Sequence, residues 1–115
     1  MLGYALIVFA IGALGGLMLA TYVLRGRLAP WPLSLLHAGL GAVGLLLIIY
    51  AAFMTGISHA ALAALVILAV AALGGFYLAS IHLRGKLAQQ PIVLIHAGVA
   101  VIGFLTLLGV VFSVF

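Results

Sequence analysis

Apolar residues form four long runs along the chain, separated by three short polar breaks. The runs cover residues 2–24, 33–53, 60–83 and 91–115. Each run is long enough to cross a membrane, because about 20 helical residues at about 1.5 Å each span a hydrocarbon core of about 30 Å. None of the runs alternates apolar and polar residues as the strand of a transmembrane barrel does. The pattern therefore predicts four transmembrane helices.

The three breaks differ in charge. All four Lys and Arg residues lie in the first and third breaks, at residues 25–27 and 84–86, and the middle break at 54–59 has none. By the positive-inside rule, we expect the two basic loops in the cytoplasm and the N- and C-termini outside. Pro32 suits the first position of the second helix, and Ser58 is a plausible N-cap for the third.

The second half of the chain repeats the first at a constant offset of 59 positions. The matching segments are Ala-Leu-Gly-Gly at 13–16 and 72–75, Leu-Arg-Gly at 24–26 and 83–85, and His-Ala-Gly at 37–39 and 96–98. Each repeat holds two helices, an even number, so both copies enter the membrane in the same direction. We therefore expect an all-α integral membrane protein with one domain, residues 1–115. It is a four-helix bundle of two tandem, parallel-oriented helical hairpins, residues 1–56 and 57–115.

The composition narrows the possible chemistry. Hydrophobic residues make up 70% of the chain and charged residues 3%, and Asp, Glu and Cys are absent from the sequence. This excludes paired-carboxylate catalysis, a Ser-His-Asp triad and thiolate ligands. The net charge of +4 is confined to two loops, which argues against nucleic acid as a partner. The first run lacks the charged start of a cleaved signal peptide, so we expect a retained span in a bacterial inner membrane.

Two histidines stand at matching places in the repeats. His37 and His96 each lie five residues beyond a proline, about one and a half turns inside an apolar helix. A polar, titratable side chain at that depth indicates either a functional site or a packed histidine that is hydrogen-bonded to a neighbouring helix. Neutral imidazole is an axial ligand of haem iron, and an opposed pair gives a six-coordinate haem b. Zinc, copper and nickel are less suitable because they require more protein ligands than this pair supplies.

Small residues follow each histidine on the same helix face, at the fourth and seventh positions. These are Gly41 and Gly44 after His37, and Ala100 and Gly103 after His96. The missing side-chain volume suits either a flat macrocycle or the close approach of a neighbouring helix. A second set of small residues in the first and third helices is assigned to helix packing: Gly12, Gly16, Ala20, Ala71, Gly75 and Ala79.

Further polar and aromatic residues lie in or beside the three breaks. Arg25 and Arg84 fix the topology, and they could also bind haem propionates. His82 lies beside the third break and has Val23 as its counterpart in the first repeat, so an interfacial position is expected. His59 lies in the middle break and would face the outside. Trp31 is expected at the membrane interface.

The chain resembles small dual-topology exporters and fluoride channels in size and number of spans. It lacks the membrane Glu of the former and the Asn-containing second helix of the latter. The His pair is similar in type to that of membrane b-type cytochromes. This resemblance implies a protein that binds haem b and transfers single electrons, with quinone or a larger respiratory complex as the redox partner. Such a protein is an electron carrier or binding subunit rather than a stand-alone enzyme.

Two other functions are open at this point. The histidines could act as protonatable gates in a small channel or transporter. The chain could also be a catalytically silent accessory subunit of a larger membrane complex. A homo-oligomer, in which His37 and His96 pair across two chains, is a further arrangement compatible with the sequence.

Overall fold

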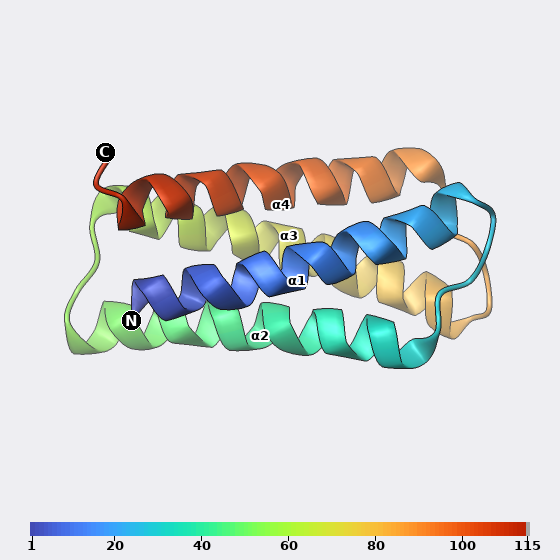
Figure 1. Ribbon diagram of the computed structural model, residues 1–115, viewed down its shortest axis with the longest axis horizontal. Helices are drawn as coiled ribbons and strands as arrows, with labels where there is room; N and C mark the ends of the chain where they lie inside the picture. Colours follow the sequence, from blue (N-terminus) through green and yellow to red (C-terminus); the bar gives the residue numbers. More distant parts are fainter. Residues whose placement is uncertain (115) are drawn as a thin grey trace.

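Four α-helices packed side by side form the protein, as the computed structural model of residues 1–114 shows (Figure 1). They are α1 (Leu2–Leu24), α2 (Trp31–Met54), α3 (His59–Leu83) and α4 (Gln90–Val111). All four are long and apolar enough to cross a membrane, which fits a membrane protein. The predicted all-helical bundle of four long apolar helices is thus confirmed.

The helix boundaries follow from local signals. Ser58 caps α3 as predicted, because its Oγ accepts a hydrogen bond of 3.1 Å from the backbone N–H of Ala61. α2 begins one residue earlier than expected, at Trp31, so that Pro32 occupies the second helical position. α4 ends at Val111 rather than at the end of the chain, and Ser113 has a φ of 57° that turns the backbone away from the helix axis.

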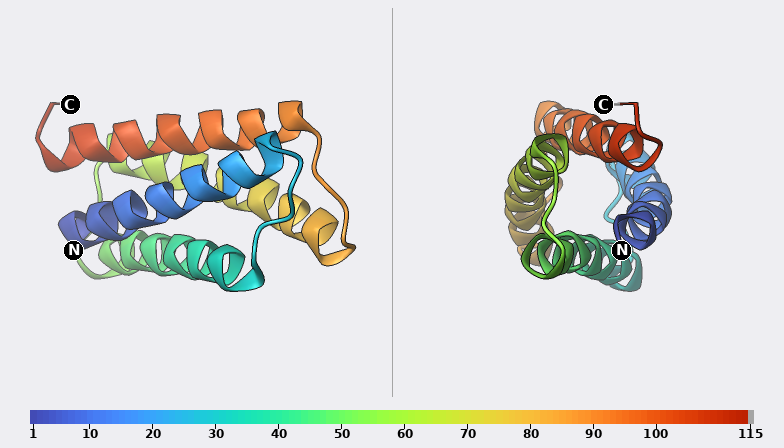
Figure 2. Two further views of the ribbon diagram at one scale, coloured as in Figure 1. Left: turned by 45° about the vertical axis from the view of Figure 1, so that its right-hand side comes forward. Right: turned by 90° about the vertical axis from the view of Figure 1, so that its left-hand side faces the viewer.

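The helices are arranged as a ring in which each contacts its two neighbours (Figure 2). α1 packs most extensively on α2, and α3 on α4; the contacts of α1 with α4 and of α2 with α3 are fewer. Within residues 1–114, the diagonal pairs α1/α3 and α2/α4 do not approach within 8 Å between Cα atoms. Side chains of α2 and α4 can therefore meet only across the interior of the ring.

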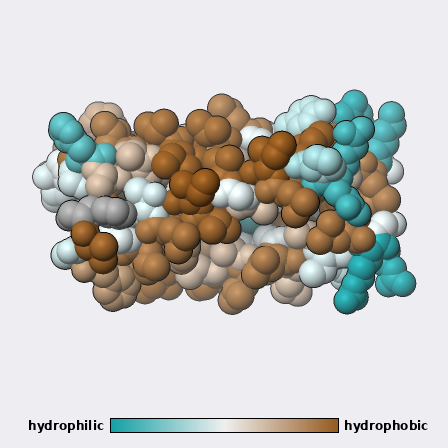
Figure 3. Space-filling model, turned by 90° about the horizontal axis from the view of Figure 1, so that it is seen from above, coloured by the Kyte–Doolittle hydropathy of each residue, from teal (hydrophilic) through white to brown (hydrophobic). Residues whose placement is uncertain are grey.

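The two ends of the bundle differ in polarity. The turns that carry Arg25, Arg27, Arg84 and Lys86 lie together at one end, called the basic end, and the turn at residues 55–58 lies at the other (Figure 1). Polar side chains gather at the basic end and apolar ones cover the middle (Figure 3). The bundle is 42 Å long, close to the about 40–45 Å thickness of a bilayer with its headgroups. The exposed apolar surface is thus long enough to face lipid.

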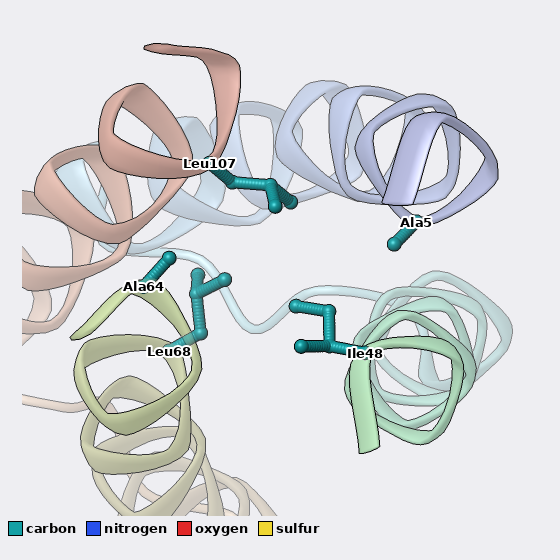
Figure 4. Close-up of a cluster of buried hydrophobic side chains, with 5 residues drawn as sticks. All are labelled: Ala5, Ile48, Ala64, Leu68 and Leu107. Atoms are coloured by element: carbon teal, nitrogen blue, oxygen red, sulfur yellow. The ribbon is translucent and has the colours of Figure 1, made fainter. Parts of the chain in front are cut away.

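The main cluster of buried aliphatic side chains lies in the half away from the basic end. Five buried residues from all four helices meet there: Ala5, Ile48, Ala64, Leu68 and Leu107 (Figure 4). Ile48 of α2 and Leu107 of α4 have no exposed surface and are the largest fully buried side chains. They close the central space between the four helices on this side.

Truncation of this aliphatic cluster should destabilise the bundle. Leu107→Ala leaves a cavity among four helices, and we expect a loss of about 2 kcal/mol or more in the free energy of unfolding. The matched control is Leu105→Ala on the same helix, because Leu105 is 53% exposed and faces outward. Unfolding of both variants in detergent, followed by circular dichroism, measures the difference. Equal stability of the two variants would contradict the central role of Leu107.

Candidate functional site

His37 and His96 meet across the interior of the bundle, between the aliphatic cluster and the basic end. Each is the seventh residue of its helix, α2 or α4, so the two imidazoles stand at the same distance from the basic end. Their ring centres are 6.3 Å apart, and the ring planes are nearly perpendicular, at 86°. The two histidines that the sequence singled out are thus brought together by diagonal helices within one chain.

Each imidazole is held by a hydrogen bond to the backbone of a neighbouring helix. Nδ1 of His37 donates to the carbonyl oxygen of Gly12 in α1, at 2.8 Å. Nδ1 of His96 donates to the carbonyl oxygen of Ala71 in α3, at 2.9 Å. Gly12 and Ala71 are separated by the same 59 positions as the two histidines. A carbonyl oxygen can only accept, so Nδ1 carries the proton in both rings and, in the neutral imidazole, Nε2 carries the lone pair.

The second ring nitrogen of each imidazole, Nε2, is not held by the protein. Within residues 1–114, no protein hydrogen bond involves either atom, and no buried side-chain nitrogen lacks a partner. Both Nε2 atoms therefore have accessible surface, although both residues are half-buried. Each histidine thus has one nitrogen fixed by the protein and one nitrogen available to a ligand.

Glycines of α1 and α3 make room for the imidazoles. A Cβ atom at Gly16 would stand 2.9 Å from Cε1 of His37, and one at Gly75 would stand 3.2 Å from Cε1 of His96. The sequence-based assignment of Gly16 and Gly75 to helix packing is therefore incomplete, since what packs against them is a histidine ring. The repeated Ala-Leu-Gly-Gly segment was the signal that could have indicated this role.

The small residues that follow each histidine have different surroundings. At Gly41 an added Cβ would meet nothing within 4 Å, so this position borders open space. Gly44 lies against the ring of Phe9, and Gly103 lies against Leu68 and Ile67. These two glycines admit side chains from the neighbouring helix, which is the packing role that their spacing also suggested. Ala100 is half-buried on α4.

The other polar residues named from the sequence lie apart from the pair. Arg25 and Arg84 terminate α1 and α3 at the basic end, and Nε of Arg84 donates to the carbonyl oxygen of Ser80 on its own helix, at 3.3 Å. His59 is the exposed first residue of α3 at the opposite end. His82 contacts α2 near the basic end, in a separate cluster. The residues described include no group of three or more His, Cys, Asp or Glu side chains that could hold a metal ion.

No family model, no curated protein and no solved structure matches the chain. The assignment of a function therefore depends on the geometry of the two histidines.

A methyl group at Gly16 should displace the imidazole of His37. Gly16→Ala places Cβ too close to Cε1, so we expect the ring to turn and the hydrogen bond from Nδ1 to Gly12 to break. Gly15→Ala is the matched control, because its Cβ would meet His37 only at an ordinary contact distance of 3.8 Å. NMR of histidine-labelled protein detects the bonded Nδ1–H signal directly. The signal should vanish in Gly16→Ala and persist in Gly15→Ala, and the opposite order would refute the contact.

Proposed function

We propose that this protein is a membrane electron carrier of the b-type cytochrome kind, in which His37 and His96 hold the iron of one haem b. The observation that carries the proposal is the facing pair of imidazoles at 6.3 Å, each with Nδ1 bound to a backbone carbonyl. Bound haem supplies a one-electron redox centre. His37 and His96 would hold it through Nε2, and the hydrogen bonds of Nδ1 would fix the orientation of the two rings.

The separation of the rings supports one metal between them. A metal–imidazole bond is about 2.0 Å long, so two imidazoles on opposite sides of one metal have ring centres roughly 6 Å apart. The observed distance of 6.3 Å agrees with this value. The spacing of the two ring centres is therefore compatible with a single metal between them.

The hydrogen bonds support the same interpretation. Metal-bound histidine usually donates its second ring N–H to a carbonyl or carboxylate, which fixes the tautomer and the ring orientation. His37 and His96 both make this bond in the tautomer that leaves Nε2 unprotonated. A histidine that served only to join helices would not require its Nε2 to face an accessible space.

The number of donors favours haem over a bare metal ion. The macrocycle of haem supplies four nitrogen ligands of its own, so two protein nitrogens are enough to make the iron six-coordinate. Zinc would require three or four protein ligands, and no such group lies within residues 1–114. Gly41 borders open space on the face of His37, and Ala100 adds only a methyl group on the face of His96. Arg25 and Arg84, at the basic end, are the candidate partners of the propionates.

The proposed molecule is a duplication of one helical hairpin. The identical donor–acceptor pattern at positions 59 apart supports two tandem repeats of parallel orientation around a central axis. The four cations at one end support a cytoplasmic location for that end, with both termini outside. In this orientation the haem would lie in the cytoplasmic half of a bacterial inner membrane.

A channel through the bundle is less well supported. An ion or proton path along the axis would have to pass the aliphatic cluster, in which Ile48 and Leu107 are completely buried. These side chains offer no hydrogen-bond partner to a dehydrated ion.

Purified protein from haem-replete cells should show a Soret band and the α-band of a reduced b-type haem. His37→Ala and His96→Ala should each abolish or shift these bands, because either change removes one axial ligand. His59→Ala is the control, since His59 is exposed at the far end of the bundle. A haem-free preparation, or full haem binding by the His37→Ala, His96→Ala double variant, would refute the proposal.

The angle between the two rings predicts a second spectroscopic property. If both rings were bound to one iron, perpendicular imidazole planes would leave two iron d orbitals nearly equal in energy, whereas parallel planes would separate them. With the planes at 86°, we expect the oxidised haem to give a strongly anisotropic low-spin electron paramagnetic resonance signal. Gly16→Ala, which displaces the His37 ring, should change that signal. A rhombic signal in the unaltered protein would mean that the rings are not perpendicular in the haem-bound state.

A further inference from the structure

A second cluster of aromatic and polar side chains lies near the basic end, at the contact between α2 and α3. The imidazole of His82 stacks on the indole of Trp31, with ring centres 4.2 Å apart and planes 6° from parallel. Nδ1 of His82 and Oγ of Ser34 are hydrogen-bonded at 3.1 Å. Ser34 lies one turn before His37 on α2, so this cluster is next to the histidine pair along the helix.

The free nitrogen of His82 is accessible. Within residues 1–114, Nε2 has no hydrogen-bond partner, and no buried side-chain nitrogen is unpaired. Trp31 is 38% exposed, so the cluster opens toward the outside of the bundle rather than into its interior. Trp31 is the first residue of α2 and His82 the last but one of α3, which places the cluster at the depth of the membrane interface.

The Ser34–His82 bond leaves Nε2 of His82 able to bind either a donor or an acceptor. A serine hydroxyl both donates and accepts, so it pairs with either neutral tautomer of the imidazole. When the hydroxyl donates to Nδ1, Nε2 bears a proton and donates to a ligand. When Nδ1 donates to the hydroxyl, Nε2 is unprotonated and accepts. The same nitrogen can thus bind a carbonyl oxygen in one state and a hydroxyl group in the other.

We propose that this cluster, Trp31, Ser34 and His82, binds the head group of a lipid-soluble quinone and of its quinol at the contact between α2 and α3. The carbonyl oxygens of a quinone accept hydrogen bonds, and the hydroxyl groups of the quinol donate them. Nε2 of His82 can form a hydrogen bond with either, because the Ser34–His82 pair allows both tautomers. The stacked indole and imidazole hold the ring plane of His82 fixed. The site deepens the proposed electron-transfer function and rests on it, because it supplies the redox partner.

The other half of the molecule contains a natural comparison. The positions equivalent to Trp31, Ser34 and His82, offset by 59, are occupied by Gln90, Val93 and Val23 at the contact between α4 and α1. Val93 is buried and apolar. That contact has neither the stacked rings nor the hydrogen bond, so it should not bind quinone. Valine at its equivalent positions also indicates that His82→Val and Ser34→Val are compatible with the fold.

The test is photolabelling with an azido-ubiquinone in phosphatidylcholine nanodiscs, with the labelled peptides located by mass spectrometry. We expect the label within residues 31–34 or 80–83, displaced by excess decylubiquinone and by its quinol. His82→Val and Ser34→Val should each reduce this labelling about tenfold, the effect of losing one good hydrogen bond. His59→Val should leave it unchanged, and His82→Gln, which keeps a donor and an acceptor, should retain more of it than His82→Val.

Three results would overturn the quinone site: labelling of the α1–α4 contact at the same level, full labelling of both valine variants, or displacement by phosphatidylglycerol as effective as that by decylubiquinone. The last result would indicate an anionic lipid headgroup. The haem spectrum of the same samples separates the two proposals. Haem without labelling overturns the quinone site alone, and specific labelling without haem overturns the cytochrome.

Discussion

The hydrogen bond from a buried imidazole to a helix carbonyl is the constraint on which the centre of this bundle depends. An unpaired N–H in an apolar interior is costly, so Nδ1 of His37 must reach the backbone of α1 and Nδ1 of His96 that of α3. A ring that bonds to a helix backbone must also lie against that helix. Gly16 and Gly75 permit this contact, because a Cβ at either place would stand within 3.2 Å of the ring.

This constraint divides the interior into two parts with different roles. Away from the basic end, Ile48, Leu68 and Leu107 fill the space and join all four helices. Nearer the basic end, the centres of the two histidine rings lie 6.3 Å apart, and each ring leaves its Nε2 atom accessible. Close packing in the first part holds α2 and α4 at the separation that sets the distance between the rings, although within residues 1–114 the Cα atoms of these two helices stay more than 8 Å apart. The aliphatic cluster is therefore a support for the histidine geometry as well as a source of stability.

The sequence predicted the helices well because length and apolarity alone decide whether a segment can span lipid. It also predicted a functional site at His37 and His96, since a titratable residue at that depth is rare, and the structure brings the two rings together. It could not predict which neighbour each small residue contacts. Gly16 and Gly44 both follow the small-residue pattern, yet one admits a histidine ring and the other the ring of Phe9. Helix rotation decides between these outcomes, and nearly uniform apolar helices carry little sequence signal for rotation.

The histidine pair draws one residue from each half of the chain, whereas the cluster of Trp31, Ser34 and His82 occurs at one contact between the halves. Their positions in the bundle explain this difference. The histidine pair stands at the centre, where each half supplies one ring, so a change in either half alone would break the pair. The contacts between the halves, α2 with α3 and α4 with α1, lie off the axis and are independent of each other. The contact between α2 and α3 can therefore contain Ser34 and His82 while the contact between α4 and α1 contains Val93 and Val23, without disturbing the centre. In the function that we propose, a duplicated bundle would in this way combine a shared centre with one specialised side, which suits an electron carrier that meets a lipid-soluble partner at one place.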